Sequence, residues 1–224
     1  MRGIIALKAS LVASSVLAAA VGLAISPAST ASAAIDGLTA NSVSAGSTWT
    51  VSGSTGTFSG VATNPTLTDT QTGTALRCKS AGVSGTVLNG TGQPGTGIGS
   101  FTSATWTSCS GPLGIAYNAT GSNFPWKFNA VSYNAGVTTG TLTNVKTHMS
   151  GVGCTADFGG STSGSAATLD VKYSNSTHTL TVLGTGDLHI WNVSGECLGL
   201  FNSGDSVSFQ GDVVSLDNIT IMSP

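Results

Sequence analysis

The segment Thr168–Leu183, with the sequence TLDVKYSNSTHTLTVL, decides the fold class. Apolar and polar residues alternate before Asn175-Ser176, and the alternation resumes at Leu180. A period of two places the apolar side chains on one face of a β-strand. Two such runs around a short polar stretch are typical of a hairpin. The segment therefore predicts two antiparallel strands with a polar turn.

The same pattern recurs along the chain. It predicts a second hairpin from Trp126–Tyr133 and Val137–Val145, and a third that turns at Gly211-Asp212 near the C-terminus. After the N-terminal segment no stretch keeps an apolar period of 3.6 residues, because glycines and β-branched residues interrupt every candidate helix. We therefore predict an all-β fold, an antiparallel β-sandwich or barrel of about a dozen short strands.

The N-terminus has the three parts of a secretory signal peptide. Arg2 and Lys8 precede an apolar run, Leu11–Ile25, and the sequence Ala31-Ser32-Ala33 provides a cleavage site. The apolar run is short for a membrane span of about 20 residues. We expect residues 1–33 to be removed, which leaves 34–224 as a single all-β domain that is secreted and has no stable membrane anchor.

Charge excludes one class of partner. Charged residues make up 7% of the chain, against about 25% in typical domains. Without Arg2 and Lys8, five basic residues stand beside nine acidic ones, a net charge of about −4. Nucleic-acid binding requires a basic surface, so we expect no nucleic-acid partner.

The four cysteines are Cys78, Cys109, Cys154 and Cys197. An even number in an exported chain predicts two disulfides. A Gly-Thr-Gly element followed by a tryptophan lies between the cysteines of each pair along the chain, Gly95–Gly97 in one half and Gly184–Gly186 in the other. This echo favours the pairs Cys78–Cys109 and Cys154–Cys197, although three connectivities remain open. Either a duplicated half-domain or compositional bias explains the echo.

The sequence contains no recognisable catalytic or metal-binding motif. The cysteines lack zinc-ligand spacing, and the histidines, His148, His178 and His189, accompany no G-x-S-x-G elbow. Glu196 is the only glutamate, which disfavours the paired carboxylates of glycosidases. We therefore expect no enzyme activity, no cofactor and no metal, and we interpret the histidines as structural.

Aromatic residues are the better candidates for binding. Large aromatic side chains bury much apolar area, so we interpret the four tryptophans, Trp49, Trp106, Trp126 and Trp191, as core residues. Tyr117 and Tyr133 lie near predicted turns and are the candidate surface residues for ligand binding.

Four stretches of the chain carry a resemblance to known proteins. They are Leu67–Thr70 through Cys78, Gly95–Gly99 through Cys109, Phe124–Ala130, and Cys197–Leu200. Together they resemble uncharacterised secreted proteins of actinobacteria over most of the mature chain. The Cys, Gly-Thr-Gly and Pro-Trp elements are more weakly similar to exported bacterial proteins of the alkane-oxidation activator type. The resemblance implies export and a β fold, and it assigns no catalytic residue.

These observations favour a secreted, non-enzymatic protein with a structural or adhesive role at the cell surface or in the extracellular matrix. Its expected partners are cell-envelope polymers, polysaccharide or further copies of itself. The alternative functions are a carbohydrate-binding module and a secreted hydrolase.

Overall fold

The computed structural model describes residues 48–53, 55–195, 197, 199–214, 216 and 218–223. All of them belong to one compact unit, Thr39–Pro224. The predicted signal peptide, residues 1–33, lies outside the described residues, and its removal stays a prediction.

Fifteen strands in the described residues form two antiparallel sheets. The smaller sheet has the order β15-β1-β5 and consists of β1 (Trp49–Ser52), β5 (Gly90–Gln93) and β15 (Thr220–Met222). The larger sheet consists of β2 (Thr57–Thr63), β3 (Thr66–Asp69), β4 (Ala75–Val87), β6 (Gly99–Ser110), β7 (Ala116–Ser122), β8 (Trp126–Asn134), β9 (Val137–Gly151), β10 (Cys154–Gly159), β11 (Ala167–Ser174), β12 (Thr179–Gly186), β13 (His189–Gly195) and β14 (Val207–Val214).

Helical structure in the described part of the chain is limited to one 3-10 turn, Pro112–Gly114. No described helix is long and apolar enough to cross a membrane. The predicted all-β fold is therefore confirmed.

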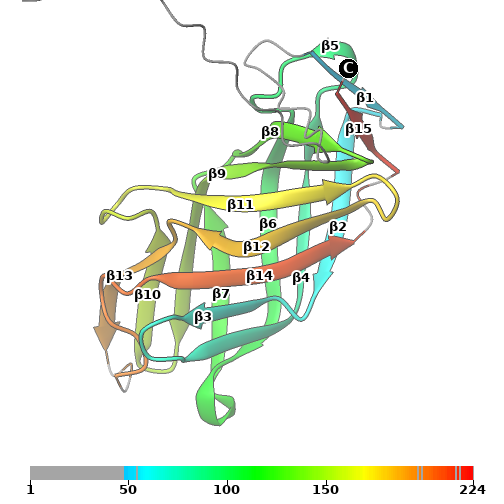
Figure 1. The fold of residues 1–224 in the computed structure, drawn as a ribbon. Coiled ribbons are helices and arrows are strands. Elements are labelled where there is room, and N and C mark those ends of the chain that lie inside the picture. Colours follow the sequence, from blue (N-terminus) through cyan, green and yellow to red (C-terminus); the bar gives the residue numbers. More distant parts are fainter. Residues whose placement is uncertain are drawn as a thin grey trace, which may run out of the picture. The chain divides into compact units, whose positions relative to one another are not determined.

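The strand pairings of the larger sheet close on themselves. Pairing runs from β11 through β12, β14, β2, β4, β6 and β7 to β9, and β9 pairs again with β11. Figure 1 shows β11, β12 and β14 crossing in front of β6 and β7, so two layers of one continuous sheet face each other. Of the two predicted architectures, the closed circuit is that of a barrel whose two sides pack like a sandwich.

The long strand β9 has different partners along its two halves. Its first half pairs with β8 and β11, and its second half, from Lys146 to Gly151, pairs with β7 and β10. Asn144, which lies at this change, has a positive φ of 67°, a conformation that asparagine tolerates better than most residues. β10 and β11 diverge at this change of partners, which we call the fork. β10 pairs on its other side with β13, the edge strand of the sheet.

Two of the three predicted hairpins are confirmed. β11 pairs with β12 from Ser174↔Thr179 onward, and β8 pairs with β9 from Asn134↔Val137 onward. The third prediction is wrong, because Gly211-Asp212 lies inside the continuous strand β14, where Gly211 pairs with Val182. Glycine permits a turn but does not impose one, and pairing with β12 keeps this segment extended.

The core lies between the two layers, where alternating side chains of both meet. Phe58 and Phe101 pack edge to face with ring centroids 4.9 Å apart. The buried Tyr173 donates a hydrogen bond of 2.6 Å to the carbonyl oxygen of Ile219. Burial raises the pKa of this phenol well above its usual value, so the hydroxyl stays a donor.

Both disulfides form within the two halves of the chain, as the echo favoured. Cys78 and Cys109 face each other across β4 and β6. Cys154 begins β10 and is bonded to Cys197, which follows β13. The second bond therefore fastens the edge strand β13 to its neighbour, and each disulfide joins adjacent strands.

Candidate functional site

A row of polar side chains lies on the outer face of β7, β9, β10 and β13. In register, Thr120 pairs with His148, His148 with Asp157, and Asp157 with Trp191. These positions alternate with the buried residues Met149, Ala156 and Ile190. Neighbouring strands lie about 4.8 Å apart, so the row spans about 14 Å.

A bulge in β13 adds a further side chain to this row. The register between β10 and β13 shifts between Thr155 and Asp157, and Asn192 has a positive φ of 51°. Bulges of this kind redirect a side chain. The Asn192 amide donates a hydrogen bond of 2.8 Å to Oδ2 of Asp157, while Nδ1 of His148 lies 2.7 Å from Oδ1.

Next to this row lies a hollow of about 200 Å³. Its lining includes Lys146, Asp157, Trp191 and Asn192, together with Gly164 and Ser165 of the β10–β11 loop, Gly160–Ala166. The loop packs closely on the end of β10, since a Cβ added at Gly159 would collide with the Ser165 carbonyl oxygen. The Lys146 ammonium donates to the carbonyl oxygen of Gly164 and fixes the loop from the other side.

Asp157 is held in its charged form. Partial burial alone would raise the pKa of Asp157, but hydrogen bonds from His148 and Asn192, with the charges of His148 and Lys146, outweigh it. The pKa therefore lies below the usual value of 3.8. At neutral pH the hollow presents one carboxylate and one ammonium group.

Trp191 forms a flat, oriented wall of the hollow. Its indole nitrogen donates a hydrogen bond of 2.8 Å to the carbonyl oxygen of Gly160, and the ring of His189 stacks beside it at 6.3 Å. The ring is only partly buried and is not part of the main apolar core. The hollow thus combines an aromatic surface with hydrogen-bond donors and acceptors. Among the described residues, no three potential metal ligands converge.

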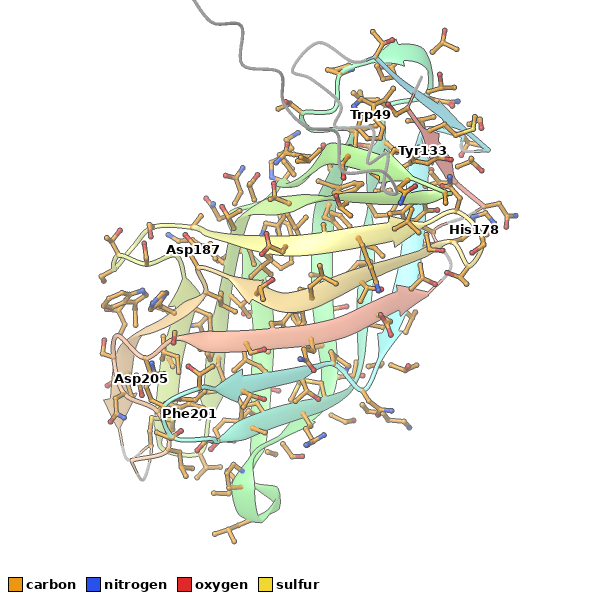
Figure 2. All side chains as sticks on the ribbon, in the orientation of Figure 1. Trp49, Tyr133, His178, Asp187, Phe201 and Asp205 are labelled. Atoms are coloured by element: carbon orange, nitrogen blue, oxygen red, sulfur yellow. A yellow bond between two sulfur atoms is a disulfide. The ribbon has the colours of Figure 1, made fainter. Side chains whose placement is uncertain are left out.

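The two tyrosines predicted as surface residues lie elsewhere. The expectation of an exposed Tyr117 is wrong, because its side chain is 6% exposed. Its ring fills the space left by Gly111 and Gly151, where an added Cβ would collide with it. Tyr133 is half-buried against the core. Figure 2 places Tyr133 at the opposite end of the sheet from Asp187, which precedes β13.

The tryptophans divide into two groups. Trp49 and Trp126 are buried and Trp106 packs against the core, as interpreted from the sequence. Trp191 differs, because it stands on the outer face of the sheet. Two histidine rings contact backbone carbonyl oxygens, His178 at Ile219 and His189 at Asp187, which agrees with structural roles.

Sequence reasoning missed the group formed by His148, Asp157 and Asn192. Nine residues separate His148 from Asp157, and a further 35 separate Asp157 from Asn192. Alternation within each strand indicates which residues share a face, but only the pairing register brings the strands together. The bulge at Asn192 adds no recognisable signal to the sequence.

No family model, curated protein or solved structure matches the chain. The resemblance to secreted actinobacterial proteins stays a prediction.

Proposed function

We propose that this protein is an extracellular, non-catalytic binding protein that adheres to polysaccharide through the hollow beside Trp191. The observation that carries the proposal is the oriented indole of Trp191 next to the Asp157 carboxylate and the Asn192 amide. An aromatic face packs against the apolar face of a sugar ring, and polar groups at its edge bind the hydroxyls.

The charges of the hollow favour a neutral glycan. Lys146 would attract an anionic ligand, but Asp157 in the same hollow would repel it. Sugar hydroxyls both donate and accept hydrogen bonds, so they suit the carboxylate and the ammonium group equally well. The row of polar side chains extends about 14 Å from Trp191 to Thr120, which gives room for more than one sugar ring.

The same geometry favours binding over hydrolysis. Most glycoside hydrolases place two carboxyl groups on either side of the scissile bond. Among the described residues, Asp157 is the one carboxylate that lines the hollow. Its lowered pKa suits a permanent hydrogen-bond acceptor and not a general acid, which requires a raised pKa.

An array of neutral and acidic oligosaccharides tests the proposal, followed by calorimetric titration of the best ligands. We expect saturable binding of neutral glycans. Trp191→Ala should weaken binding by about tenfold, on the assumption that a sugar ring gains about as much from stacking as a nucleobase, for which the contribution is on the order of 1–3 kcal/mol. Asp157→Ala should weaken glycan binding more than Trp191→Ala does, because this substitution also removes the hydrogen-bond partner of His148 and Asn192.

Tyr133→Ala provides the matched control, since it removes a half-buried aromatic ring at a distance from the hollow. This variant should bind like the wild type. The proposal is wrong if no glycan binds, or if Trp191→Ala and the wild type bind equally. Release of reducing ends by the wild type, lost in His148→Ala or His189→Ala, would support the hydrolase instead.

A further inference from the structure

A second hollow lies inside the closed sheet. It has a volume of about 80 Å³, and its walls come from both layers. Trp106, Trp126, Leu142, Val145 and Met149 line it on the side of β6, β8 and β9. Cys78, Cys109 and Tyr117 line it near the first disulfide. Protein interiors are normally packed with few voids larger than a water molecule, so this space is unusual.

The walls of the interior hollow are mostly apolar, which disfavours an ordered water there. A buried water requires two to four polar partners. The side chains that line the hollow are apolar apart from the Thr147 hydroxyl, the Tyr117 phenol and the indole N–H groups of Trp106 and Trp126. The Trp126 N–H is already donated to the carbonyl oxygen of Ser122 at 2.8 Å. Apolar cavities of this kind stay dry and accept apolar molecules.

The size and position of the space indicate the kind of occupant. A second apolar void of about 40 Å³ shares the wall residues Trp106, Trp126 and Leu142 with the first. The first void alone has about half the volume of the cavity of about 150 Å³ that binds benzene in an engineered protein, and the second void adjoins it. The occupant must therefore be small and slender, and it must carry no charge, because no described lining residue is charged.

The interior hollow shares part of its wall with the outer hollow. Thr147 and Phe158 face each other across β9 and β10 and line both the interior hollow and the outer one. The fork at which β10 and β11 diverge lies beside this pair. Movement of the Phe158 ring would open the wall there without breaking the circuit of paired strands.

From this geometry we propose that the interior of the closed sheet is a binding site for a small hydrocarbon, which enters at the Thr147–Phe158 wall. The site differs from the outer glycan site in chemistry and in its side of the sheet. Neither proposal depends on the other.

Xenon and n-pentane are the probes. A crystal of the wild-type protein under xenon pressure should show xenon between Trp106, Trp126 and Leu142. In solution, n-pentane should produce a saturable change in tryptophan fluorescence. Ala119→Leu adds three heavy atoms inside the hollow and should weaken pentane binding at least tenfold. Leu142→Ala enlarges both voids and should strengthen it.

Ala116→Leu makes the same change on the same strand at an exposed position, and it should bind pentane like the wild type. A crystal without interior xenon would overturn the proposal, and so would equal pentane binding by Ala119→Leu and Ala116→Leu. If Ala119→Leu fails to fold, the wild-type xenon experiment decides alone. Phe158→Leu, which shortens the shared wall residue, should accelerate pentane release; an unchanged rate would rule out entry at this wall.

Discussion

The two faces of β9 and β10 have opposite chemistry. On the outer face Lys146 and Asp157 line a polar hollow, and His148 lies beside Asp157, whereas on the inner face Val145 and Met149 line an apolar hollow. Adjacent residues in the sequence therefore face opposite environments. The contrast follows from the period of two in a strand, and it shows how a thin sheet can separate two binding chemistries.

Loss of an inner side chain should have the largest effect. Tyr117→Ala removes a buried ring, and large-to-small core changes of this kind cost about 4 kcal/mol. Tyr117→Phe keeps the ring and should cost less than about 1 kcal/mol. Chemical denaturation measures both. Equal stability of Tyr117→Ala and the wild type would contradict the inner placement of this residue.

Removing each disulfide in turn should distinguish the outer site from the rest of the sheet. The double variant of Cys154→Ala and Cys197→Ala opens a loop of 43 residues and should lose about 3 kcal/mol of unfolding free energy. It should also weaken glycan binding, because β13 carries Trp191 and Asn192. Cys78→Ala with Cys109→Ala should lose comparable stability but keep glycan binding while folded. Equal loss of glycan binding in both double variants would contradict this assignment.

A smaller effect is expected at the loop that covers the outer hollow. Lys146→Gln removes the ammonium group that donates to Gly164 and should cost about 1 kcal/mol. Hydrogen exchange in Gly160–Ala166 should become faster. Lys127→Gln is the matched control, because Lys127 donates at 2.8 Å to Ser100 in a different region. Unchanged hydrogen exchange of this loop in the Lys146→Gln variant would contradict the contact between Lys146 and Gly164.

The smallest effect concerns the pH dependence of the outer row. Because folding lowers the pKa of Asp157, its contribution to stability is present above the usual value of 3.8 and is lost as the pH falls through the lower, folded value. Both partners are partly exposed, with 49% of His148 and 42% of Asp157 accessible, so the contribution should stay below about 1 kcal/mol.

Asp157→Asn should therefore show a shallower loss of stability than the wild type between about pH 5 and about pH 2. Thermal unfolding across this range measures the difference. Asp170→Asn is a suitable control, since Asp170 accepts a hydrogen bond from Thr185 and has no histidine partner. A steeper acid dependence in Asp157→Asn would contradict the lowered pKa.

Much of the fold could be predicted from local patterns. The hairpins at Asn175-Ser176 and Asn134–Gly136 followed from alternation and turn residues. The echo favoured both disulfide pairs but left three connectivities open, and the structure decided between them. The hairpin at Gly211-Asp212 could not be judged in this way, because pairing with β12 keeps that segment extended. Tyr117 was misplaced because Gly151, one of the two glycines that make room for its ring, lies on the separate strand β9 and becomes its neighbour only through strand pairing.

Strands, turns, a low content of charged residues and the presence of two disulfides could all be read from the sequence, since each depends on local chemistry or on counting. The sites could not be read in this way. The group around Asp157 and the interior hollow depend on register, on a bulge and on the closure of the sheet. These are relations between strands, and a shift of one residue would exchange the two faces.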